Sequence, residues 1–98
     1  MNGVELIAQE RQRQVDTEGW SAEHDDAHKI GEMALAARCY AQTSYSQVCG
    51  WSAGGPERTW PWNKQSWKPA DDPIRNLVKA GALIAAEIDR LQRKEVSE

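Results

Sequence analysis

The stretch from Trp51 to Pro69, WSAGGPERTWPWNKQSWKP, constrains the fold of this chain more than any other segment. It holds four of the five tryptophans and three of the four prolines, and its Pro and Gly residues interrupt both helical and strand periodicity. Loops of this length are uncommon in compact domains unless they are functional or ordered by their own side chains. Because disordered segments are poor in aromatic residues, we predict an ordered aromatic loop packed over a helical frame.

Two segments before this loop have the periodicity of amphipathic helices. The first is expected from Val4 to about Asp16, with Gly19 as its stop. Its apolar face is formed by Val4, Ile7 or Ala8, Arg11 and Val15. A polar link at 21–28 leads into the second helix, expected at 26–42. The apolar stripe of this second helix comprises Ile30, Met33, Ala34, Ala37 and Tyr40 or Ala41.

The third helix follows the loop and has the clearest periodicity. Asp72 can cap it and Pro73 suits its first position, so we expect it at 73–94, with a fraying charged tail at 93–98. Its apolar face consists of Ile74, Leu77, Val78, Gly81, Ile84, Ala85, Ile88 and Leu91. The predicted fold is mainly α: one domain over 1–98, with three helices and a long Trp/Pro-rich loop packed over them. The length of this apolar face, on so small a domain, also predicts a homodimer.

The composition excludes several classes of protein. The net charge is −3 and no basic cluster is present, which argues against general nucleic-acid binding. No apolar run approaches the ~20 residues of a membrane span, and no signal peptide is visible, so we expect a cytoplasmic protein without membrane contact. Cys39 and Cys49 are too few for a disulfide scaffold and are expected to be reduced thiols.

Six titratable residues are crowded into ten positions at the start of the second helix: Glu23, His24, Asp25, Asp26, His28 and Glu32. One interpretation is a metal or acid–base site, because carboxylate and imidazole groups bind divalent ions. The other is helix capping together with a solvated polar face. The sequence pattern allows both, and it contains no recognised metal motif.

The tryptophans of the loop suggest an aromatic wall against which a planar ring could stack. These residues are Trp51, Trp60, Trp62 and Trp67. Stacking of a base on an aromatic side chain is worth ~1–3 kcal/mol. Positive charge for a phosphate is available nearby in sequence from Arg58, Lys64, Lys68 and Arg75. The alternative is that the indoles form the core of a chain that contains no Phe.

The segments 10–28 and 60–93 resemble a family of small uncharacterised proteins of bacteriophages and prophages. This resemblance implies a phage origin and no established activity. The order Gly19-Trp20, Asp25-Asp26, His28, Trp67, Pro69 and Arg75 also resembles the ryanodine-receptor (RyR) repeat domain. The RyR-like resemblance implies a ligand-binding or regulatory module rather than an enzyme.

A third resemblance is to MazG-like all-α nucleotide pyrophosphohydrolases, which hold magnesium between acidic motifs on facing helices. Glu23-x-x-Asp26 is similar to one of these motifs, and the second would have to be Glu87-x-Asp89. This resemblance implies a Mg²⁺-dependent enzyme whose metal-binding residues are Glu23, Asp26, Glu32 and Glu87.

Three functional hypotheses follow from these observations. The first is a non-catalytic phage accessory or anti-defence protein, in the host bacterial cytoplasm, that binds a small nucleotide-like ligand or a host defence component. Its ligand-binding residues would be Trp20, His28, Trp60, Trp62, Trp67, Lys68 and Arg75, with no metal and no cofactor. The second is the Mg²⁺-dependent pyrophosphohydrolase. The third is a protein–protein inhibitor of a host system that uses its tryptophans as interface anchors.

Overall fold

A computed structural model describes residues 1–50, 55 and 58–97 of the chain. Within these residues the secondary structure is entirely helical. The elements are α1 (Gly3–Glu18), α2 (Ala22–Asp26), α3 (Glu32–Cys49), the short 3-10 helix η2 (Lys64–Ser66) and α4 (Pro73–Ser97). The predicted mainly α fold, with three long helices and a loop between the second and third of them, is confirmed. Trp51 of the predicted aromatic wall lies outside the described residues.

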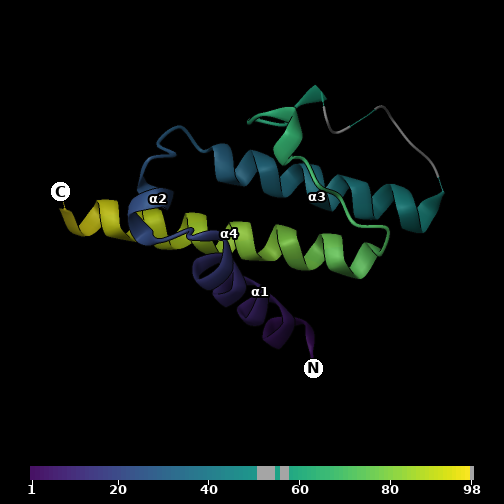
Figure 1. Cartoon of the computed structure of the whole chain (residues 1–98), viewed down its shortest axis with the longest axis horizontal. Coiled ribbons are helices and arrows are strands. Elements are labelled where there is room, and N and C mark those ends of the chain that lie inside the picture. Colours follow the sequence, from purple (N-terminus) through teal and green to yellow (C-terminus); the bar gives the residue numbers. More distant parts are fainter. Residues whose placement is uncertain (51–54, 56–57, 98) are drawn as a thin grey trace.

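The longest helix, α4, is the centre of the fold. It contacts α1, α2 and α3. In Figure 1, α3 and α4 run antiparallel side by side, and α1 crosses α4 on the side away from α3. The main described part of the Trp loop (residues 51–69) starts over the middle of α3 and runs along that helix to the start of α4 (Figure 1). This arrangement leaves α1 and the Trp loop on either side of α4.

The predicted second helix begins later than expected, and a separate short helix precedes it. Ser21 caps the short helix α2 by accepting a hydrogen bond from the His24 amide, in a segment expected to be a polar link. Gly31 then takes a left-handed conformation with φ of 84°, which ends the turn and lets α3 begin at Glu32 rather than at Asp26. At the other end, α3 continues beyond the predicted boundary to Cys49, where Gly50 is left-handed.

The buried face of α1 is polar, which differs from the expected apolar face. Val4 is 78% exposed, whereas Glu10 and Gln14 are each only 2% exposed. The physical reason is that the Glu10 carboxylate is paired with arginines when α1 packs on α4. Beside this pair, Ile7 packs so tightly on Gly81 of α4 that a Cβ atom added at Gly81 would lie 2.5 Å from the Ile7 Cδ1 atom.

The hydrophobic core lies between α3 and α4 and is built largely of small side chains. Its buried members are Met33, Ala36, Ala37, Tyr40, Ala80, Leu83 and Ala86. Four half-buried tryptophans, Trp20, Trp60, Trp62 and Trp67, pack against this cluster. The alanines allow the two helices to approach closely, and the indoles supply the volume that the missing Phe residues would otherwise provide.

The face of α4 predicted to be buried is largely exposed. Five of its large apolar side chains, which we call the α4 stripe, are 45–60% exposed: Ile74, Leu77, Ile84, Ile88 and Leu91. The helix instead buries the face that carries Ala80, Leu83 and Ala86. The reason is that the Ala-rich face of α3 requires small partners. The predicted fraying tail is also helical as far as Ser97.

The end of the Trp loop is tied to the start of α4 by Asn76, which is fully buried. Its side-chain amide donates to Ala70 O at 2.9 Å and to Gln47 Oε1 at 3.0 Å, and its Oδ1 accepts from Ala70 N at 2.8 Å. The Ser44 hydroxyl donates to Pro73 O at 2.9 Å nearby. These bonds hold the chain in place as it leaves the loop and enters α4.

Candidate functional site

A pocket of about 380 Å³ lies between α1, α4 and the Trp loop. This volume is in the range of small-molecule sites. One wall comes from α1, with Glu10, Arg13, Gln14 and Glu18. The rest of the lining is formed by Trp20, Tyr40, Trp60, Trp62, Ser66, Lys68, Arg75, Lys79 and Leu83. We call this cavity the α1–α4 pocket.

Glu10 organises the charged side of the α1–α4 pocket. Its carboxylate accepts hydrogen bonds from Arg13 Nε at 2.8 Å and Nη2 at 2.9 Å, from Arg75 Nη2 at 2.6 Å, and from Gln14 Nε2 at 3.3 Å. Burial would raise the pKa of Glu10, but the hydrogen bonds and charges of Arg13 and Arg75 outweigh it and lower that pKa. A buried carboxylate from α1 thereby holds two guanidinium groups beside each other at the pocket.

Lys79 adds a third cation to the same side. Its ammonium group donates to Lys68 O at 2.8 Å and lies 5.4 Å from the centre of the Tyr40 ring. The pKa of Lys79 is lowered by burial first and then by the neighbouring charge of Arg75, with smaller contributions of the same sign from Arg13 and Lys68. Glu10 acts in the opposite direction and raises the pKa of Lys79, so burial remains the main cause of the lowered value.

The aromatic side of the pocket is an interlocked set of rings. Trp60 meets Tyr40 and Trp62 edge to face, with centroids 5.6 and 5.3 Å apart. Trp67 packs at 4.8 Å from both Tyr40 and Trp60. The Trp60 indole donates to Asn63 O and to the Ser66 hydroxyl, each at 3.1 Å, which fixes the ring on η2. These contacts hold the aromatic wall rigidly over the core.

Five of the seven residues predicted to bind a ligand line this pocket. They are Trp20, Trp60, Trp62, Lys68 and Arg75. The other two lie behind it. Trp67 supports Tyr40 and Trp60 from the core side, and His28 packs between His24 and Trp62, at 5.1 and 4.9 Å from their rings. The four described tryptophans are half-buried. A flat and exposed patch of tryptophans would instead have favoured the protein–protein inhibitor hypothesis.

Sequence reasoning missed the contribution of α1 to the pocket. Glu10, Arg13 and Gln14 form one wall of the pocket and were not among the predicted ligand-binding residues. Their spacing of three and four residues places them on one helical face, and this was the available signal. Two further lining residues, Tyr40 and Lys79, were also not among the predicted ligand-binding residues, and Tyr40 was expected only in the apolar stripe of the second helix.

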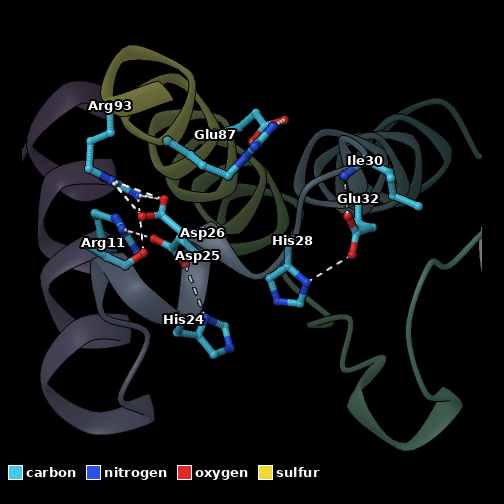
Figure 2. Close-up of polar contacts among 11 residues, drawn as sticks. Arg11, His24, Asp25, Asp26, His28, Ile30, Glu32, Glu87 and Arg93 are labelled. Atoms are coloured by element: carbon cyan, nitrogen blue, oxygen red, sulfur yellow. Dashed lines mark hydrogen bonds and ion pairs between the residues drawn. The ribbon is translucent and has the colours of Figure 1, made fainter. Parts of the chain in front are cut away.

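The acidic cluster of α2 is a set of separate ion pairs (Figure 2). Buried Asp25 pairs with Arg11 of α1 and with His24 Nδ1. Asp26 pairs with Arg93 of α4 at 2.7 Å. Figure 2 shows these contacts converging where α1, α2 and α4 meet. The cluster therefore ties the short helix α2 to its two neighbours.

The four carboxylates of the magnesium hypothesis do not come together. Glu32 accepts from the Ile30 amide at 3.0 Å and lies 3.1 Å from His28 Nδ1, and Glu87 accepts from Arg90 at 2.6 Å. Asp26 faces Arg93, and Glu23 is exposed. Across residues 1–50, 55 and 58–97, no group of three His, Cys, Asp or Glu side chains is placed to hold a metal ion.

Comparisons of the chain with protein-family models, with curated proteins and with solved structures give no match. In the described part of the chain, none of the helices combines the length and the apolar character needed to cross a membrane.

Proposed function

We propose that this protein binds a small anionic ligand that carries a planar ring, such as a nucleotide, in the α1–α4 pocket and does not convert it chemically. The observation that carries the proposal is that cations and aromatic rings together line one cavity of about 380 Å³. A mononucleotide needs both features, because its phosphate requires positive donors and its base requires a flat apolar surface.

The charge of the pocket favours an anion. Four cations line it, Arg13, Lys68, Arg75 and Lys79, against the two carboxylates of Glu10 and Glu18. The difference, four minus two, is an excess of two positive charges in a chain whose net charge is −3. Guanidinium groups also recognise phosphate oxygens through paired N–H donors, and those of Arg13 and Arg75 are already held by Glu10.

Trp20 is the stacking surface in this proposal. Its indole lies parallel to the His24 ring, with an interplanar angle of 2° and centroids 5.6 Å apart. Because His24 covers one face of the Trp20 indole, the indole lines the pocket with its opposite face or its edge. Trp60 is held by rings on several sides and serves mainly as the wall behind the ligand.

The cellular role that we propose is sequestration. The resemblance of segments 10–28 and 60–93 to small phage and prophage proteins supports a role in the cytoplasm of an infected bacterium. A binding protein without conversion chemistry would act there by lowering the free concentration of a nucleotide-like signal of the host defence. The RyR-like order of residues also favours a ligand-binding module.

The test begins with native mass spectrometry of the protein purified from bacteria, before and after denaturation, and continues with calorimetric titration of nucleoside mono- and diphosphates.

We expect Trp20→Ala to weaken binding about tenfold, which corresponds to the loss of one stacked base. Lys68→Ala is expected to weaken it several-fold. Lys64→Ala is the matched control, because Lys64 is an exposed lysine of the same loop that does not line the pocket. A protein that carries no small molecule and binds no nucleoside phosphate would contradict the proposal.

A further inference from the structure

Two side chains of the α1–α4 pocket contain buried polar atoms without a hydrogen-bond partner in the described part of the chain. These atoms are Gln14 Oε1 and Trp62 Nε1. Leaving a buried donor or acceptor unsatisfied is unfavourable, so such groups are uncommon in folded proteins. One of these atoms is an acceptor and the other is a donor, and both belong to the lining of the same pocket.

The orientation of the Gln14 amide is fixed by its neighbour. Gln14 Nε2 donates to Glu10 Oε2 at 3.3 Å. A carboxylate whose pKa is lowered accepts hydrogen bonds and does not donate them, so the amide nitrogen must be the atom that faces Glu10. The oxygen is therefore the atom left without a partner, and it is the acceptor that Gln14 can offer the pocket.

Gln14 is also the least firmly held partner of Glu10. Its bond is the longest of the four that Glu10 accepts, and the other three come from Arg13 and Arg75. Glu10 therefore remains satisfied if the Gln14 amide turns. The terminal χ3 torsion of Gln side chains has a broad distribution. A modest rotation can therefore bring the buried Oε1 atom of Gln14 toward a ligand.

Trp62 is free to bind only through its N–H group. Its ring is already packed against His28 at 4.9 Å and against Trp60 at 5.3 Å. Trp60 makes a useful comparison, because its own indole N–H is satisfied by Asn63 O and the Ser66 hydroxyl. The sequence suggested that a ligand stacks on the Trp62 ring, but other rings already occupy that surface. A hydrogen bond to the Trp62 N–H group is therefore the more available interaction.

We propose, on the basis of the proposed function, that Gln14 and Trp62 determine ligand specificity by forming hydrogen bonds with the polar edge of the ligand's ring. Gln14 Oε1 accepts a hydrogen bond from an N–H group of the ligand, and Trp62 Nε1 donates to a lone pair on the ring. The ligand class is an amino-substituted nucleobase attached to phosphate, in which an exocyclic amino group and ring nitrogens supply the donor and the acceptor.

The test compares ligands that differ in one amino group. AMP and CMP are first compared by calorimetry, and whichever binds the wild-type protein more tightly is chosen. This ligand and its analogue without the exocyclic amino group are then each titrated into the wild-type protein. We expect the wild type to prefer the amino-bearing ligand by about tenfold, the value of one hydrogen bond that satisfies a buried group. Gln14→Met should bind both ligands with similar affinity. Gln12→Met, an exposed glutamine of the same helix, should keep the wild-type preference.

Trp62→Phe tests the second half of the proposal, because it keeps an aromatic ring and removes the N–H group. We expect it to weaken binding of the amino-bearing ligand several-fold without lowering the melting temperature. Equal affinity of the wild type for the two ligands would overturn the assignment of Gln14 while leaving the proposed function standing. Failure of the wild type to bind any nucleoside phosphate would overturn both. The wild-type comparison does not depend on the folding of any variant.

Discussion

Glu10 is a carboxylate that is buried only because two arginines, one from its own helix and one from α4, neutralise it. Arg75 lies 65 positions further along the chain and donates to Glu10 at 2.6 Å. Removing one member of such a group leaves the others without their counter-charge. The stability lost in this way exceeds the modest net stabilisation that the intact pair provides. Glu10 thus links the stability of the fold to the charge of the α1–α4 pocket.

We expect Glu10→Gln to lower the free energy of unfolding at neutral pH by about 2 kcal/mol, since its arginine partners remain partly exposed. The folded pKa of Glu10 lies below its ordinary value of 4.5, so the stabilisation is complete above that pH and is lost as the pH falls through the lowered folded pKa. The variant should therefore lose less stability on acidification than the wild type.

Urea unfolding of both proteins at neutral pH and below pH 4.5 measures this difference. Glu95→Gln changes an exposed carboxylate of α4 and should reproduce the wild-type acid dependence. An acid dependence of Glu10→Gln that is equal to that of the wild type would contradict the role of Glu10.

At the scale of elements, α1 is positioned by the contact between Ile7 and Gly81. A Cβ atom at Gly81 would lie 2.5 Å from Ile7 Cδ1 and 2.8 Å from Ile7 Cγ1, both too close for an unshifted side chain. Alanine in a helix is otherwise favoured over glycine by ~1 kcal/mol. We therefore expect Gly81→Ala to destabilise the wild type by about 1 kcal/mol net, because overpacking exceeds the gain in helix propensity.

The sign of this effect should reverse when Ile7 is shortened. In an Ile7→Ala background, Gly81→Ala should stabilise the protein by roughly 1 kcal/mol, since only the helix propensity remains. Denaturant unfolding of the four proteins in this double-mutant cycle gives the coupling between the two positions. The same effect of Gly81→Ala in both backgrounds would show that α1 does not pack on Gly81.

The helices themselves could be predicted from the sequence, but their buried faces could not. The periodicity of α4 identified the helix and its start at Pro73, yet α4 has two apolar faces, one of large residues and one of alanines. Which face is buried depends on the small side chains of α3, and that is a tertiary property. The division between α2 and α3 depends on the left-handed conformation of Gly31, which glycine allows but does not require.

The candidate site was predictable to the extent that its residues are close in sequence. Trp60, Trp62 and Lys68 belong to one loop, and Arg75 follows it after a few residues. The wall from α1 could not be found in this way, because it meets Arg75 only when the chain has folded. Burial of Glu10 and Gln14 in particular contradicts the usual preference of these residue types for the surface.

At the scale of the whole molecule, the α4 stripe remains without a partner within the described chain. Its members follow the three- and four-residue spacing of a coiled-coil seam, with Gly81 occupying one position of that seam. Because Ile7 covers Gly81, the available surface is divided, and the larger part contains Ile84, Ile88 and Leu91. We propose that a second copy of the chain covers this part, since identical seams of this kind are complementary to one another.

We expect light scattering after size-exclusion chromatography to give the mass of a dimer for the wild type. Ile88→Lys should give a monomer without a loss of helix content, because the charge is placed at an exposed position of the seam. Ile30→Lys is the matched control, since Ile30 is 88% exposed in the turn before α3 and lies outside the stripe. A wild type that remains monomeric as its concentration rises would exclude this interface.

The central place of α4 has a consequence for how the protein is made. α1, α2 and α3 each pack on α4, and α4 follows all of them in the chain. During translation the earlier helices are therefore synthesised before α4, on which they pack. Glu10 cannot pair with Arg75 until α4 has been made. Because the contacts that bury the core join distant parts of the chain, the core cannot be completed until α4 has been synthesised, and the α1–α4 pocket forms in the same event as the core.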